Sequence, residues 1–212
     1  MKYNIVILVS AFTIGFPSFG CGQDIEGQKP PSDSSQTFRL RNEGKPLSRQ
    51  ILRAELIAFG FQSSTTGFLM LMPQDYTNWS FVGAGARFGD AFTKAPVLDD
   101  DNWLFNYLIH PLSGCLMYNT MRSQGAKIVP SFLFATSQSL IWEFLMESWL
   151  EQPSIQDLLV TSNIGSLMGE GVHQLTLRMG RNGFRTSEKV IVILTNPSFW
   201  LNNGFRRKPI SE

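Results

Sequence analysis

Residues 139–170 read SLIWEFLMESWLEQPSIQDLLVTSNIGSLMGE, two long apolar runs that meet at Pro153. The residue before a proline is pushed away from helical geometry, so the first run should end before Pro153. Ser154 then stands at the N-cap position of the second run, and Asp157 follows three residues later in capping-box spacing. Apolar residues at helical spacing on both sides of the break predict two consecutive helices that share a core.

The chain from residue 46 onward continues this pattern. We expect one long helix at 46–73, with Ser48 as its N-cap, and another through NYLIHPLSGCLMY (106–118). A third starts at Ser131 behind a proline. The segment SEKVIVILTNP (187–197) is ambiguous between strand and helix, and its helical neighbours favour a helix. The predicted fold class is all-α, a single-domain bundle of about five to seven helices.

The N-terminus, MKYNIVILVSAFTIGFPSFGCG (1–22), has the layout of a secretory signal peptide. Its apolar run is shorter than the roughly 20 residues that span a bilayer, which favours cleavage over a permanent anchor. Two cleavage sites compete. We favour an ordinary peptidase site after Gly20 or Gly22, and the alternative is a bacterial lipoprotein site in which Cys21 is acylated.

Composition bounds the domain organisation of the chain and the kinds of partner that it can bind. Residues 23–45 are rich in Gln, Pro, Ser and Asp, which predicts a flexible, disordered linker ahead of a helical domain at 46–212. Lys and Arg total 18 against 17 for Asp and Glu, a formal net charge of +1, so we expect no nucleic acid as a partner. If Cys21 is removed or acylated, Cys115 has no disulfide partner and should be a buried apolar residue.

Polar and small residues recur at four-residue spacing inside three of these apolar runs. Residues four apart lie on one face of a helix, so each set forms a column. Because the surrounding sequence is apolar, we expect the middle members of each column to face inward or line a cleft. Gly165 and Gly169 in the third column also form a small-xxx-small pair, which predicts close approach by another helix. The columns are Asn106, His110, Gly114 and Tyr118; Ser139, Glu143, Glu147 and Glu151; and Asp157, Thr161, Gly165, Gly169 and His173.

Glu143 and Glu147 interrupt the apolar run LIWEFLMESWL, where a buried carboxylate is unfavourable unless it is paired or protonated. His110 is the only histidine of its helix and is the partner that we favour. Pro111 lacks an N–H and should bend that helix beside His110, which would aim the imidazole into a cleft. Two interpretations stay open: a buried pair that fixes helix register, and an acid-base pair.

The candidate site follows from these columns. No metal or other cofactor is expected, although His110, Glu143 and Glu147 form a weak metal alternative. Glu170 and His173 have the Glu-x-x-His spacing of di-iron bundles, but such sites need two copies and this chain has one. The candidate catalytic residues are His110, Glu143, Glu147 and Asp157, with Asn106, Tyr118, Arg122, Ser139 and Trp142 as residues that support the cluster or bind a ligand.

Three stretches, NYLIHPLSGCLMY, the quoted segment at 139–170 and the later TNP, resemble an uncharacterised exported bacterial family known as domain of unknown function 3943. The similarity covers about residues 79–197, and the departure is Ser162, where the family pattern has a proline. The resemblance implies an exported protein and names no activity. The matching positions are Asn106, His110, Pro111, Gly114, Tyr118, Arg122, Trp142, Glu143, Glu147, Pro153, Ser154, Asp157, Gly165, Gly169 and Glu170.

We therefore expect an exported cell-envelope protein, in the periplasm or at the outer-membrane periphery, whose helical domain binds a lipid-like or protein partner. The first alternative is a hydrolase of envelope lipid or glycan, with His110 as general base and Glu143 orienting it. The second is a membrane-embedded helical protein, because residues 131–150 are long enough to span a bilayer. Its two glutamates would cost several kcal/mol on insertion scales, which counts against embedding.

Overall fold

Helices alone form the regular structure of the part of the chain that the computed structural model describes, residues 40–73, 77, 79–98, 103–181 and 183–205. This confirms the predicted all-α class. The predicted signal peptide, the acylation alternative at Cys21 and most of the linker lie outside the described residues. The helices are α1 (Leu47–Leu69), α3 (Ala84–Thr93), α4 (His110–Arg122), α5 (Ile128–Ile141), α6 (Ile155–Leu159), α7 (Gly165–Gly180), α8 (Thr186–Thr195) and α9 (Pro197–Asn203).

Three π-helical turns extend or join these helices. The turn η1 (Phe105–Ile109) leads into α4, and η2 (Trp142–Met146) continues α5 before the 3₁₀ turn η3 (Glu147–Trp149). The turn η4 (Val160–Ile164) joins α6 to α7. π turns are rare and are found mostly as single turns inside α-helices, frequently at functional sites.

The first π turn, η1, lies directly before His110 and Pro111, and the proline explains it. This proline supplies no N–H for the helical ladder, so a regular α-helix is disturbed one turn earlier. The backbone N–H of His110 bonds to the carbonyl of Phe105, five residues back, instead of to the residue four back. Where the sequence predicted a bend beside His110, the helix has a widened turn that continues into α4.

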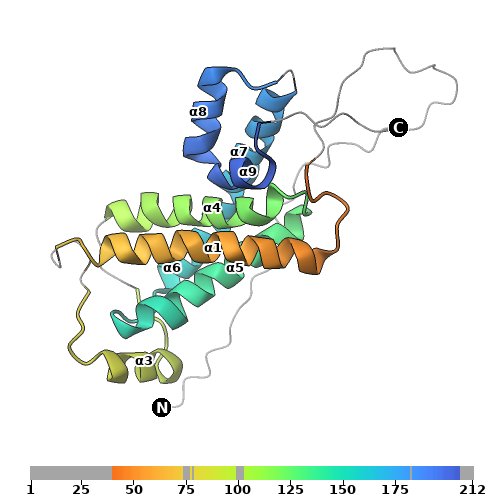
Figure 1. Cartoon of the computed structure of the whole chain (residues 1–212). Coiled ribbons are helices and arrows are strands. Elements are labelled where there is room, and N and C mark those ends of the chain that lie inside the picture. Colours follow the sequence, from red (N-terminus) through yellow and green to blue (C-terminus); the bar gives the residue numbers. More distant parts are fainter. Residues whose placement is uncertain (1–39, 74–76, 78, 99–102, 182, 206–212) are drawn as a thin grey trace, which may run out of the picture. The chain divides into compact units, whose positions relative to one another are not determined.

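The helix α4 is central to the described domain, because it packs against α1, α5 and α7 (Figure 1). Two glycines allow the closest approach. A Cβ on Gly165 would lie 2.6 Å from the Cα of Gly114, and a Cβ on Gly169 would lie 2.7 Å from the Tyr118 ring. The close helix packing predicted from Gly165 and Gly169 is thus present, and α4 is the helix that approaches.

The interior is unusually polar. Gln62 donates to the side-chain oxygen of Gln138 at 3.2 Å, and Asn119 donates to the carbonyl of Gly169 at 3.1 Å. A hydrophobic cluster accompanies this network, and it is built largely of small residues and methionines. Its buried members are Ala54, Ala58, Met117, Tyr118, Met121, Ala126, Phe134 and Ala135.

The outer faces of the helices are correspondingly apolar. On α1, Leu52, Leu56 and Phe59 follow one another at helical spacing, and all three are exposed. In the described part of the chain, one helix, Ile128–Trp149, is long and apolar enough to cross a membrane. Core helices of soluble proteins can have the same length and composition, so this property alone is weak evidence for a membrane span.

One predicted helix start is confirmed and two are wrong. The hydroxyl of Ser154 accepts the N–H of Asp157 at 3.1 Å, as its predicted N-cap role requires. The ambiguous segment is the helix α8. However, α1 begins at Leu47, so Ser48 is not its N-cap, and α5 begins at Ile128 rather than Ser131. A proline fits the first turn of a helix, where its missing N–H is not needed, so Pro130 does not delay the start of α5.

Candidate functional site

A cavity of about 70 Å³ lies among α1, α4, α5 and the π turns. A volume of roughly 10–15 Å³ suffices for one water molecule, so the cavity has room for several. Among the residues predicted from the sequence, its lining includes His110, Ser139, Trp142, Glu143 and Glu147. The columns on α4 and on α5 with η2 therefore meet at one cavity.

His110 is held from two sides by the third column. Its Nε2 lies 3.5 Å from Oδ1 of Asp157, and its Nδ1 lies 3.3 Å from the hydroxyl of Thr161. Asp157 belongs to α6, whereas Thr161 lies in the π turn η4. The imidazole is thus oriented by two residues that are one turn apart on a neighbouring helix.

Glu143 lies in the π turn η2 and is 2% exposed. Its Oε2 accepts the backbone N–H of Ser154 at 2.9 Å, which ties η2 to the start of α6. One ligand-type atom from each of His110, Glu143 and Asp157 lies within 4.8 Å of the other two. The structure therefore brings together one imidazole and two buried carboxylates from three different helices.

Glu147 has a different environment at the same cavity. Its Oε2 accepts the indole N–H of Trp142 at 2.6 Å, and its Oε1 accepts that of Trp79 at 3.1 Å. Both carboxylate oxygens thus bind aromatic N–H donors. The weak metal alternative predicted from the sequence was His110, Glu143 and Glu147. In the structure, the three residues whose ligand atoms lie close together are His110, Glu143 and Asp157.

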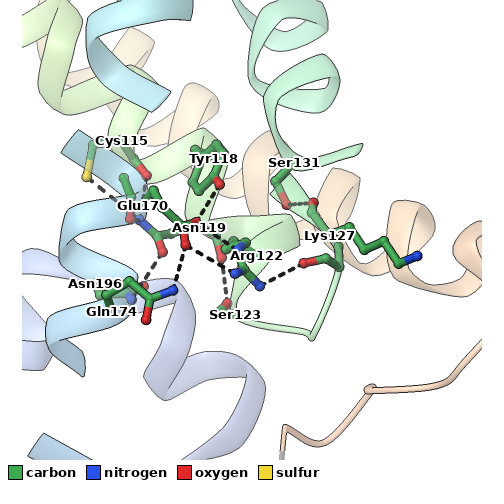
Figure 2. Close-up of polar contacts among 12 residues, drawn as sticks. Cys115, Tyr118, Asn119, Arg122, Ser123, Lys127, Ser131, Glu170, Gln174 and Asn196 are labelled. Atoms are coloured by element: carbon green, nitrogen blue, oxygen red, sulfur yellow. Dashed lines mark hydrogen bonds and ion pairs between the residues drawn. The ribbon is translucent and has the colours of Figure 1, made fainter. Parts of the chain in front are cut away.

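A second polar cluster joins α4 to α7 and is centred on Glu170 (Figure 2). Tyr118 donates its hydroxyl to Oε2 of Glu170 at 2.6 Å, and Arg122 forms a two-pronged contact with both carboxylate oxygens at 2.8 and 3.1 Å. Gln174 adds a fourth bond, to Oε1, at 2.7 Å. The arrangement is a partly buried ion pair in which both oxygens of Glu170 accept hydrogen bonds. We call it the clamp, because it holds α4 against α7.

Proton affinities in the second cluster follow from these contacts. Burial alone would raise the pKa of Glu170, but the bonds from Arg122, Tyr118 and Gln174 outweigh it and hold that pKa below its usual value. Burial and the bond to Glu170 raise the pKa of Tyr118. The carboxylate is therefore ionised and the phenol neutral at physiological pH, so this cluster has no group that exchanges a proton near pH 7.

The structure thus divides the predicted site into two groups. His110, Glu143 and Asp157 form one, with Glu147, Ser139 and Trp142 around the same cavity. Tyr118 and Arg122 belong to the other. Asn106 is buried one turn before His110, in line with its column. The sequence reasoning did not assign roles to Glu170 in the ion pair or to Trp79 at Glu147, since both contacts join residues distant along the chain.

The family model described as Domain of unknown function (DUF3943) matches residues 95–198 and confirms the resemblance seen in the sequence. No curated protein and no solved structure matches the chain. The matched segment contains both polar clusters.

Proposed function

From the premise that residues 95–198 place the chain in the family of domain of unknown function 3943, we propose that it is an exported, membrane-peripheral protein of the bacterial cell envelope. Its helical domain binds envelope lipid through the outer faces of the helices. The observation that carries the proposal is the distribution of side chains: many polar residues are buried in the interior, and many large apolar residues are exposed on the exterior. Monomeric soluble proteins rarely expose large contiguous apolar patches.

The exposed apolar residues follow stripes on successive helices. Leu56 and Phe59 on α1 are 68% and 69% exposed. Val129 and Leu133 form a similar stripe on α5, and Leu108 in η1 is also exposed. A bilayer surface is a partner that can accept apolar residues from several helices at once.

Flotation with vesicles tests lipid binding. The full chain is mixed with vesicles of phosphatidylethanolamine and phosphatidylglycerol and centrifuged through a density gradient. We expect it to float with the vesicles, and the double variant Leu56→Gln, Phe59→Gln to bind about 100-fold more weakly or worse, since burial of each such side chain contributes about 1.5–3 kcal/mol. Ser63→Gln, at an exposed position of the same helix, is the matched control and should float like the wild type.

Two outcomes would contradict lipid binding. One is a wild-type chain that stays monomeric in buffer without detergent and does not float. The other is a double variant that binds as well as Ser63→Gln does, because the apolar stripe of α1 would then contribute nothing.

Export rests on the signal-peptide pattern at 1–22 and on the family resemblance. Mass spectrometry of the protein recovered from a bacterial envelope fraction tests it. A mature chain that starts at Cys21 or Gln23 agrees with cleavage by an ordinary peptidase, and an acylated Cys21 identifies a lipoprotein. An intact Met1 in a soluble cell fraction contradicts the proposal.

A second candidate function is hydrolysis of an envelope lipid or glycan. It is supported by the cavity, at which His110 and Glu143 lie together with an imidazole that Asp157 and Thr161 orient. In this function His110 acts as general base. Product release from extracted envelope lipid and glycan should be lost in His110→Asn and retained in Asp90→Asn, a surface variant. Equal activity of the two variants excludes this role for His110.

A further inference from the structure

We propose that His110, Glu143 and Asp157 bind one divalent transition-metal ion, of the kind represented by Zn²⁺ or Mn²⁺. The inference goes beyond lipid binding, which requires no ion, and it is an alternative to the general-base role of His110, because an Nε2 lone pair that binds an ion cannot accept a proton. It rests on four properties of these side chains: their spacing, charge, orientation and access.

The spacing suits a metal ion. Bonds of about 2.0–2.1 Å from zinc to nitrogen and oxygen place neighbouring ligands of a tetrahedral site about 3.4 Å apart. Nε2 of His110 and Oδ1 of Asp157 are 3.5 Å apart. With Glu143 included, the three ligand atoms lie within 4.8 Å of one another, so a small inward movement of one carboxylate completes the triangle.

The charge of the group also suits a cation. Glu143 and Asp157 are 2% and 4% exposed and stand close together. Two carboxylates in a poorly solvated place repel each other when both are ionised. A divalent cation between the two carboxylates carries a charge of +2, which balances both negative charges. One imidazole with two carboxylates is a donor set that zinc and manganese accept.

The ligands are oriented by neighbouring residues, as metal ligands usually are. Thr161 contacts Nδ1 of His110, which leaves Nε2 directed to the side of Asp157. The backbone N–H of Ser154 fixes Oε2 of Glu143. Each of these contacts joins two helices, so the triangle is set by packing rather than by flexible loops.

The backbone and the cavity agree with this assignment. His110 directly follows η1, Glu143 lies within η2 and Thr161 lies within η4, so all three π turns converge on the triangle. His110 and Glu143 line the cavity of about 70 Å³, which has room for water on the open side of an ion. Three protein ligands with an open position are the arrangement of catalytic rather than structural zinc sites.

Metal titration of the full chain tests the site. Protein free of affinity-tag histidines is stripped with EDTA, dialysed and titrated with Co²⁺, Zn²⁺ and Mn²⁺. We expect one ion per chain and a rise in Tm of several degrees at saturation, because an ion that binds only the folded state stabilises it. Less than one ion per chain for all three metals overturns the proposal.

Variants locate the ion. His110→Gln, Glu143→Gln and Asp157→Asn should each weaken binding about 100-fold or more, since each removes one of three protein ligands. Glu147→Gln, at the same cavity but outside the triangle, is the matched control and should bind like the wild type. A loss of binding in Glu147→Gln that equals the loss in Glu143→Gln overturns the assignment.

A spectroscopic measurement on the wild type keeps the test independent of variant folding. The chain has 2 histidines, His110 and His173. Pulsed electron paramagnetic resonance of the bound Mn²⁺ should detect one imidazole nitrogen, and the signal should persist in His173→Leu. A spectrum without imidazole coupling, or one that disappears in His173→Leu, contradicts ligation by His110.

Discussion

His173 lies on α7 beside the Glu170 cluster and is fully buried. Neither ring nitrogen has a hydrogen-bond partner among the described residues. Burial lowers its pKa to about 4, repulsion from Arg122 acts in the same direction, and attraction to Glu170 opposes both. The imidazole is therefore neutral in the folded protein over a range where it is charged in the unfolded chain.

This difference predicts a specific pH dependence of stability. The unfolded chain takes up a proton at His173 near pH 6.5 and the folded chain only near pH 4, so the contribution of His173 is complete above pH 6.5 and is lost as the pH falls toward 4. Between pH 7 and pH 4.5 we expect about 2 kcal/mol of the loss in unfolding free energy to come from this residue. Urea unfolding at both pH values should show that the loss is smaller by this amount in His173→Leu. Identical losses in the two proteins would contradict the buried neutral imidazole.

Glu170 allows a test of the clamp between α4 and α7. In Glu170→Gln the amide loses the charge that attracts Arg122 and presents an N–H₂ group where an acceptor is needed. We expect about 2–3 kcal/mol lower unfolding free energy, the range for hydrogen bonds to charged groups. Asp90→Asn is the control, because the Lys94–Asp90 pair is exposed, at 64% and 38%, and exposed pairs contribute about 0–1 kcal/mol. Equal effects of the two variants would show that Glu170 is not a clamp.

Helix packing limits the side chain at Gly165. A Cβ there meets the Cα of Gly114 at 2.6 Å, and a Cβ on Gly114 itself would overlap the carbonyl oxygen of Thr161. Gly165→Ala should therefore lower the unfolding free energy by about 3 kcal/mol, at the upper end of the usual overpacking range. Gly171→Ala, on the same helix with no atom within 4 Å of its Cβ, should instead be neutral or stabilise by about 0.5–1 kcal/mol. Thermal unfolding of the two variants compares them, and a similar Tm in both would contradict the close contact.

At the scale of helices, the sequence predicted which residues face inward but not how they meet. Four-residue spacing correctly indicated that the middle members Gly114, Glu143 and Gly165 are buried, and Ser154 was recognisable as an N-cap. The approach of Asp157 to His110 depends on how α4 packs against η4, the turn that follows α6, which spacing within one helix cannot report. The π turns were also not predicted, because each preserves the local apolar pattern while it changes which carbonyl a given N–H reaches.

For the whole molecule, the contrast between polar interior and apolar exterior predicts a fluorescence response. Of the 5 tryptophans, Trp103 is 68% exposed, and Trp149 and Trp200 are exposed as well. Tryptophan rings favour the membrane-water interface, so vesicles should shift the emission to shorter wavelength and reduce quenching by iodide. Trp103→Phe should diminish the change. An emission spectrum that vesicles leave unchanged would contradict contact between these faces and lipid.

The buried Cys115 has a practical consequence. Its thiol is nearly inaccessible, and burial raises its pKa to about 11, with a smaller opposing effect from Asn119. Thiolate is the form that attacks disulfide reagents, so this thiol should stay silent in the native protein at pH 8. With Cys21 replaced by serine, the chain keeps one sulfhydryl that becomes reactive only when α4 separates from its neighbours. The rate at which a reagent labels Cys115 therefore measures how often the centre of the domain opens.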